Sequence, residues 1–326
     1  MELGWSTEVL LLALGGALFN ALYSSNDNFI LHKKITHPTD SFTPIYFYMV
    51  IGSWVGTICL LIYNPLFGRF IEPNYNGFEF GSWQAQKNAI VSGSLGAVST
   101  IFYLWGNKKL DPSLVLGLSS STVLFLAVYD SIEERLSLQT IIIPALLLVI
   151  GAGLTSMKQI KGGVKFTFIG LFVLLVGRCS VDTAEAIFRQ IGGNQMDAIN
   201  FCFWRFVWQS LVLTLIVVAI SSITGKIKIV LYHRKQLKSA MLWIVITMFF
   251  VFLSNTLFQK AMQTGLISKT QLVMNFRIAL GIPITLIANR VYPGIFGDNL
   301  PKQKSVWLIR FLGVLLIIVS IAFLIK

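Results

Sequence analysis

Long apolar runs recur along the whole chain, and they constrain its fold more than any other feature. A helix needs about 20 mainly apolar residues to cross the hydrocarbon layer of a bilayer. The sequence contains ten such runs, separated by polar breaks, at residues 8–31, 44–63, 88–106, 112–130, 137–157, 165–188, 198–222, 239–259, 268–288 and 305–325. Because backbone groups cannot stay unpaired in lipid, the runs predict an all-α polytopic membrane protein with ten transmembrane helices.

The composition excludes several classes of soluble protein. Of the 326 residues, 55% are hydrophobic and only 12% are charged, whereas soluble domains carry about a quarter charged residues. We expect the lipid bilayer to cover this surface, and the formal charge of +12 to lie on loops beside the membrane rather than to bind nucleic acid. The three cysteines show no paired spacing and the three histidines lie in predicted loops, so we predict no metal site and no cofactor.

The ten runs divide into two sets of five. The break at 158–165 is short, basic and contains glycines, as a linker should, so we predict five-helix repeats at 1–160 and 161–326. The first run of each set becomes polar toward its end, and the second run is rich in aromatic residues. Because each set has an odd number of crossings, the second copy would enter the membrane upside down. Inverted repeats of this kind are common in secondary transporters, whose substrate lies near the midplane between the halves.

Three short segments add a resemblance to a known family. They are the Phe-Trp-Arg-Phe sequence at 203–206, the Glu-Glu-Arg-Leu-Ser turn at 133–137 and the Gly-Ala-Gly sequence at 151–153. Together with the five-plus-five arrangement, they resemble the EamA branch of the drug/metabolite transporter superfamily over nearly the whole chain. The resemblance implies a transporter of small metabolites. The chain departs from the family pattern at Tyr48, where members often have an arginine that matches Arg205.

Polar residues inside the predicted bundle give the candidate substrate site. A charged side chain at mid-bilayer costs about 2.5–3.5 kcal/mol, so each one should have a partner or face a wet cavity. Arg277 lies at the centre of the ninth run with no evident partner, and is our main candidate for binding a carboxylate or phosphate group. Asn275 lies two residues away, and Ser120 and Thr122 lie in the corresponding run of the first half. The alternatives are a bond from Arg277 to backbone carbonyls and a helix–helix bond from Asn275.

Two further charge pairs have a structural interpretation and a functional one. Arg178 and Asp182 are four residues apart on one helix face and would neutralise each other, and Glu185 would do the same for Arg205. In the functional interpretation, Arg205 binds substrate and Glu185 takes part in ion coupling. The sequence leaves both interpretations open.

Three other candidates have competing explanations. Asp27 is an isolated carboxylate in the first run and could carry a coupling proton, but Lys33 and Lys34 beside it also fit an interfacial anchor. Tyr48 and Trp204 could stack on a ring of the substrate, although aromatic residues at such positions also serve in packing or at the membrane interface. Both explanations stay open for each of these residues.

These observations predict a secondary carrier, not an enzyme, that moves a small anionic or zwitterionic metabolite by alternating access. The protein would be integral and multi-pass (in the cell membrane if the chain is prokaryotic), with proton or counter-substrate coupling and homodimer formation left open. One alternative is a membrane-embedded enzyme that acts on lipid, but the runs contain no His-Asp or Cys-His set. The other is a non-transporting membrane partner or sensor, which would not need isolated charges near the midplane.

Two arguments disagree about orientation. Fifteen lysines and arginines fall in the odd-numbered loops, seven fall in the even-numbered loops or at the termini, and four arginines lie within the runs, out of 26 in all. The positive-inside rule then places the odd-numbered loops in the cytoplasm and both termini outside. Members of the resembled family usually have both termini inside, so the orientation stays open.

Overall fold

The computed structural model describes residues 6–30, 42–109, 120–133, 137–155, 177–223, 234–291 and 304–325. Within these ranges the chain is helical and contains no strand, as the apolar runs predict. The helices are α1 (Thr7–Phe29), α2 (Phe42–Ile71), α3 (Trp83–Lys109), α5 (Thr122–Ile132), α6 (Leu138–Thr155), α8 (Cys179–Gly193), α9 (Ala198–Ile223), α11 (Arg234–Thr264), α12 (Ile267–Met274), α13 (Arg277–Val291) and α14 (Lys304–Ile325).

Five helices contain a stretch that is long and apolar enough to cross a membrane. The stretches are Thr7–Ser24, Met49–Ile71, Ala198–Ile223, Lys238–Thr264 and Ser305–Phe323. Shorter apolar helices follow at Thr122–Ile132 and Gln139–Thr155. Parts of the predicted fourth and sixth runs, and the predicted linker at 158–165, lie outside the described residues.

The loop after the second run is shorter than predicted. The sequence places it at 64–87, but α2 continues to Ile71 and α3 begins at Trp83. Pro65 removes one helical hydrogen bond without ending the helix, because the apolar residues after it continue to favour a helix. Arg69 in the last turn of α2 also interacts favourably with the negative end of the helix dipole.

The remaining loop, residues 72–82, folds back on α9 and α11. The Asn200 side chain donates to the Gly77 carbonyl at 3.0 Å and accepts from the Glu79 amide at 3.2 Å. Lys260 forms an ion pair with Glu72. Gly81 turns the chain at a φ of +68°, in the left-handed region, and its missing Cβ would collide with the Met196 methyl group. These contacts fasten the loop to helices from the other half of the chain.

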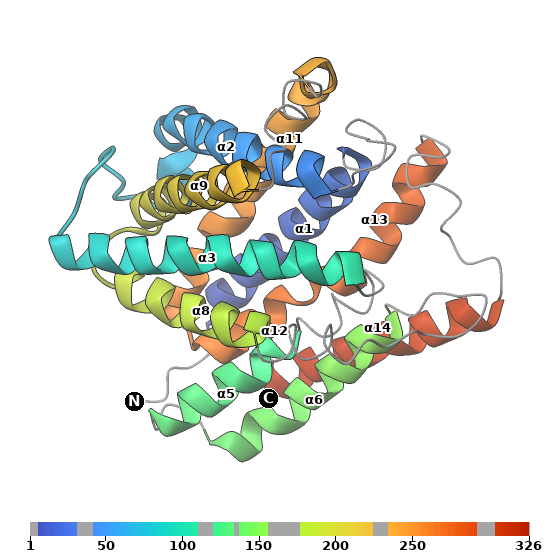
Figure 1. Ribbon diagram of the computed structural model, residues 1–326. Helices are drawn as coiled ribbons and strands as arrows, with labels where there is room; N and C mark the ends of the chain where they lie inside the picture. The colour runs from blue at the N-terminus through green and yellow to red at the C-terminus, as the bar shows by residue number, and fades with distance from the viewer. Residues whose placement is uncertain are drawn as a thin grey trace.

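Helices from the first half pack mainly on helices from the second half. α1 packs on α11, α3 on both α8 and α9, and α2 on both α9 and α11. α6 and α14 lie along each other at the lower side of Figure 1, and α12 contacts α5. The fold is therefore held by pairs of helices that are distant in sequence.

Glycine makes the α6–α14 pair unusually close. A Cβ on Gly151 would lie 2.7 Å from the Gly313 carbonyl oxygen, and a Cβ on Gly313 would lie 2.6 Å from the Gly151 carbonyl oxygen. Only small residues let two helix backbones approach to this distance. A hydrogen bond of 2.7 Å from the Ser320 hydroxyl to the Pro144 carbonyl joins the same two helices.

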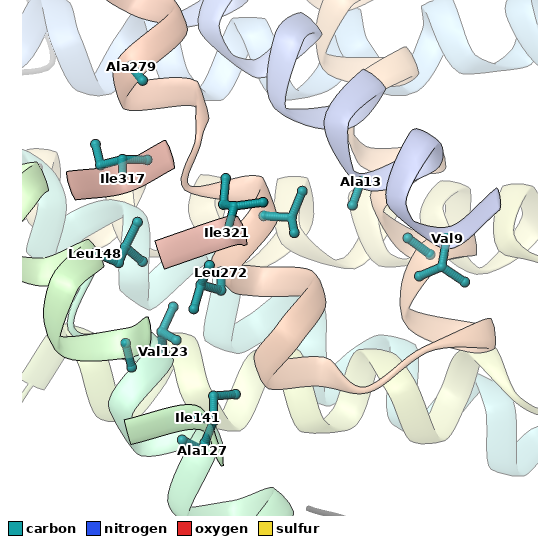
Figure 2. Close-up of a cluster of buried hydrophobic side chains, with 13 residues drawn as sticks. Val9, Ala13, Val123, Ala127, Ile141, Leu148, Leu272, Ala279, Ile317 and Ile321 are labelled. Atoms are coloured by element: carbon teal, nitrogen blue, oxygen red, sulfur yellow. The ribbon is translucent and has the colours of Figure 1, made fainter. Parts of the chain in front are cut away.

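The largest apolar cluster lies where the two halves meet. Its side chains, drawn in Figure 2, come from α1, α5, α6, α11, α12, α13 and α14. Ala13, Val123, Ile141, Leu272 and Ile317 are all fully buried in it. Because the cluster takes residues from both halves, neither half completes it alone.

Candidate functional site

The predicted ninth run is broken in the middle. It was expected to form one helix over 268–288, but it forms α12 and α13, with a turn at Asn275–Phe276 between them. The Phe276 amide donates to the Val273 carbonyl at 2.9 Å, and the Ile278 amide donates to the Asn275 carbonyl at 3.0 Å. These bonds to the third residue back tighten the turn and keep its backbone groups paired. Figure 2 shows the ribbon narrowing between Leu272 and Ala279.

Arg277 is the first residue of α13, directly after this turn. Its Nη1 donates a hydrogen bond of 3.1 Å to the Asn20 side-chain oxygen on α1. Its Nε is buried without a hydrogen-bond partner, and among the described side chains no carboxylate lies within ion-pairing distance of its guanidinium. The guanidinium is therefore held by a neutral amide, and some of its N–H groups remain available as hydrogen-bond donors.

Asn20, the partner of Arg277, is itself held on α1. It is buried, donates to the Tyr23 hydroxyl at 2.8 Å and accepts a weaker bond from the Ser24 hydroxyl at 3.4 Å. Sequence reasoning gave Asn20 no particular role. The polar end of the first run thus brings an acceptor to Arg277.

Asp182 on α8 is a carboxylate whose charge interacts with that of Arg277. The Arg178 Nε is 3.3 Å from its Oδ2, so the predicted pair on α8 is confirmed. Ser99 on α3 donates to its Oδ1. The site therefore brings together α1, α3, α8 and α13.

Glu185 forms a second, more completely paired cluster. The Arg205 Nε and Nη2 lie 3.1 Å and 2.6 Å from its Oε1, so the predicted structural pair is confirmed. Arg189 Nη1 approaches the same oxygen at 3.8 Å. Both arginines are buried, with 6% and 5% of their surfaces exposed, so one carboxylate serves two guanidinium groups.

Arg189 was missed as an interior residue, because the predicted sixth run ends at 188 whereas α8 continues to Gly193 and buries it. It donates to the Gln259 side chain at 3.0 Å, and Gln259 returns a bond of 2.8 Å to the Arg189 carbonyl. Its guanidinium also stacks on the Phe258 ring, 5.0 Å from the centroid. These partners lie on α11, about 70 residues away in the chain, so no local pattern could have revealed them.

Ser120 and Thr122, the predicted counterparts of Arg277, and its neighbour Asn275 are buried at helix starts and breaks. Asn275, Ser120 and Thr122 each have 1% of their surface exposed. Ser120 lies in the turn before α5, and Thr122 lies within hydrogen-bonding distance of the Cys179 thiol on α8. Among the described residues, the side-chain nitrogen of Asn275 has no hydrogen-bond partner. Arg277 is brought together with Asn20 and Asp182 rather than with these three residues.

Trp204 lies against the 72–82 loop. Its indole N–H donates to the Glu79 carbonyl at 2.8 Å, and its ring packs edge-on against Phe80 and Phe203, with centroids 5.1 and 5.2 Å away. These contacts fit the packing explanation for Trp204. Tyr48 and Asp27 belong to α2 and α1, but their side chains lie outside the part of the structure that is described.

Asp130 is a second interior residue that sequence reasoning missed. It is fully buried on α5, and its Oδ2 accepts the Ser268 amide at 3.0 Å and also the Ser268 hydroxyl. Because α12 begins at Ile267, this amide is one of the first-turn donors that a helix leaves free. The carboxylate therefore caps α12 from the other half of the chain, where the helix dipole favours negative charge.

Comparisons with known proteins show what fold the chain has. No protein-family model and no curated protein matches the chain. A solved structure described only as "Crystal structure of protein" is similar over 98% of this chain and 97% of that chain, with a TM-score of 0.61 and 12% sequence identity. At this identity the similarity concerns the fold alone. The chain therefore has the same overall fold as a solved protein of nearly equal length.

Proposed function

We propose that the chain is an integral, multi-pass membrane protein that carries a small anionic or zwitterionic metabolite by alternating access. The observation that carries the proposal is Arg277, an interior cation at a helix break whose hydrogen-bonding partner is neutral. Proteins retain a charge in such a place when it has a function, because burial away from water is costly.

The distribution of side chains supports a lipid environment. Leu215 on α9 and Leu308 on α14 are both 70% exposed, whereas Arg189 and Arg205 are buried. Soluble proteins show the opposite distribution, with arginines outside and leucines inside. A bilayer would cover the exposed leucines, and the helices would shield the arginines from lipid.

The pattern of helix pairs supports two inverted repeats. If the first-half helices correspond in order to those of the second half, the α1–α11 pair corresponds to α8–α3, and α3–α9 corresponds to α11–α2. The α2–α9 and α6–α14 pairs correspond to themselves. All these pairs pack together, as two copies related by a twofold axis require. The same arrangement supports the resemblance to the EamA branch of the drug/metabolite transporters.

The broken ninth run supports a substrate site beside Arg277. Transporters with inverted repeats often bind substrate at discontinuous helices, where the positive end of a half-helix faces an anionic group. α13 begins at this point and Arg277 is its first residue, so the helix dipole and the guanidinium would act on one anion. The turn at Ser120–Ser121 before α5 is the corresponding feature of the first half.

Transport in proteoliposomes tests this proposal. Wild-type protein should exchange at least one of labelled glutamate, succinate or inorganic phosphate in a counterflow assay. Arg277→Ala should weaken the apparent affinity by about 10- to 100-fold, because a hydrogen bond to a charged group contributes about 1.5–3 kcal/mol. Arg277→Lys should recover only part of the affinity, because lysine lacks the planar pair of donors.

Arg310→Ala is the matched control. Arg310 lies on α14, where its guanidinium is 5.8 Å from the Trp307 ring centroid, and its loss should leave transport unchanged. If Arg277→Ala transports with the rate and affinity of the wild type, the proposed site is wrong. Absence of exchange for every anion would instead favour the alternatives of a lipid-modifying enzyme or a non-transporting partner.

A further inference from the structure

α8 carries two carboxylates less than one turn apart, and their surroundings differ. Glu185 lies between the Arg205 and Arg189 guanidinium groups, with a shortest distance of 2.6 Å. Two buried guanidinium groups therefore share this one carboxylate. Glu185, a candidate for ion coupling from the sequence, is engaged by both of them.

Asp182 is held more loosely. Its side chain is 20% exposed, against 13% for Glu185, and its nearest cation, Arg178 Nε, is 3.3 Å away. Its other oxygen accepts the Ser99 hydroxyl, a neutral donor. A partly exposed carboxylate whose shortest contact with a cation is 3.3 Å, and whose other oxygen accepts from a neutral hydroxyl, can exchange a proton at lower cost than one held by closer ion pairs.

The charged and titratable groups around Asp182 come from several helices. Arg178, Cys179 and Glu185 share α8 with it, and Arg277 acts on it from α13. Ser99 on α3 contributes a neutral hydroxyl. Arg205 on α9 is engaged by Glu185. Arg277 is therefore the cation through which a bound substrate would act on Asp182.

We propose that Asp182 binds the coupling proton, so that an anion at Arg277 and a proton at Asp182 bind together and cross the membrane as a symported pair. This inference rests on the proposed function. An anion at Arg277 places a second negative charge near ionised Asp182, and protonation removes the repulsion between them. By linkage, each ligand then strengthens the binding of the other by the same factor. The proton comes from water on the entry side and returns to water on the exit side.

The first test needs no substrate. Infrared difference spectra of the full-length protein in lipid, recorded between acidic and alkaline pH, should contain a protonated-carboxyl C=O band. Asp182→Asn should remove that component, because asparagine resembles the protonated acid in shape but cannot titrate. The matched control is Asp130→Asn, which alters a buried carboxylate whose partner is Ser268. An Asp182→Asn spectrum identical to that of the wild type overturns the proposal.

The second test measures coupling in proteoliposomes with labelled glutamate, succinate and inorganic phosphate. For a singly charged anion carried with one proton, a gradient of one pH unit should drive about tenfold accumulation. Asp182→Asn should still exchange the anion but should lose this accumulation and the pH dependence of binding. Ser99→Ala, a milder change, should keep coupling and move the pH midpoint upward, since ionised Asp182 loses a donor.

The outcomes separate the two proposals. If the wild type carries an anion but the pH gradient gives no accumulation, coupling through Asp182 is wrong and the transport function stands. If accumulation persists in Asp182→Asn, coupling through Asp182 is likewise wrong, and the transport function again stands. If the wild type carries none of the three anions, the proposed function fails and the symport proposal fails with it.

Discussion

Arg205 and Arg277 are both interior arginines, but their environments are opposite. Arg205 contacts Glu185 through two nitrogens, and its guanidinium lies 5.2 Å from the centroid of the Phe206 ring. Among the described residues Arg277 makes one hydrogen bond, to the neutral Asn20. Each guanidinium has one buried nitrogen without a partner in this part of the chain, Nε in Arg277 and Nη1 in Arg205, so the difference is the counterion. In a low-dielectric interior, a neutralised arginine stabilises the fold, whereas an incompletely neutralised one is costly and calls for a further ligand.

The two clusters also differ in how their helices are arranged. The Glu185 cluster lies between helices that continue without a break through the contact, α8, α9 and α11. The Arg277 site lies at the break between α12 and α13. Continuous helices hold side chains rigidly, while a break gives a half-helix whose end can face a ligand. This difference supports a structural role for the first cluster and the proposed binding role for the second.

Glu185→Gln should give the largest effect on stability. The substitution leaves Arg205 and Arg189 buried without their counterion, and breaking a buried ion pair in this way costs about 3–5 kcal/mol. The measurement is thermal unfolding of the purified protein in detergent. Glu8→Gln, at an exposed carboxylate in the first turn of α1, is the control and should unfold like the wild type. If Glu185→Gln and the wild type unfold at the same temperature, the Glu185 cluster does not stabilise the fold, and the distinction between it and the Arg277 site is wrong.

Asn20→Ala should have an intermediate effect, and on binding more than on stability. Arg277 would lose the acceptor that orients it, so the apparent affinity for the transported anion should fall about tenfold, while stability should fall by about 1 kcal/mol. Counterflow kinetics and thermal unfolding measure the two quantities. Ser24→Ala removes only the weak 3.4 Å bond to Asn20 and serves as the matched control. If affinity is unchanged in Asn20→Ala, Asn20 does not orient Arg277.

Tyr75→Phe should have the smallest effect on stability and transport. It tests whether every buried polar group that lacks a hydrogen-bond partner has a function. Tyr75 lies in the 72–82 loop and is 4% exposed, and its hydroxyl has no hydrogen-bond partner in the described part of the chain. Removing such a hydroxyl should change stability by less than about 1 kcal/mol near neutral pH. Transport should be unchanged. Impaired transport in Tyr75→Phe would mean that the loop takes part in the mechanism.

The same residue gives a pH dependence whose sign can be stated. Burial raises the pKa of Tyr75 from 10.0 to about 12, and the nearby charges of Asp197 and Glu79 add to this effect. Between these two values the unfolded chain loses the proton more readily than the folded one. The wild type should therefore lose stability as the pH rises from 10.0 to about 12, and Tyr75→Phe should lose less.

Local pairs could be predicted from the sequence, and distant ones could not. Arg178 and Asp182 are four residues apart, so helix geometry alone brings them to one face. The bond between Arg277 and Asn20 joins residues that are 257 positions apart. No spacing rule connects such residues, because the contact depends on how α1 and α13 pack.

The helix break at Asn275–Phe276 also could not be predicted from the sequence. Neither glycine nor proline stands at the turn, and asparagine and arginine, the polar residue types at 275 and 277, also occur inside the unbroken helix α9. Pro65 shows the opposite case, since it was expected to end a helix that continues to Ile71. Local signals for helix ends are weak, and tertiary packing overrides them.

The sequence by itself determined that this chain is helical, with apolar segments long enough for a bilayer and few charges between them. Composition and periodicity settle these features because each residue's preference for water or lipid is a local property. Only the tertiary structure decided that Glu185 neutralises Arg205 and Arg189, that Asp130 caps α12, and that Arg277 has a neutral partner. Those facts depend on which helices pack together, and packing is a property of the whole chain.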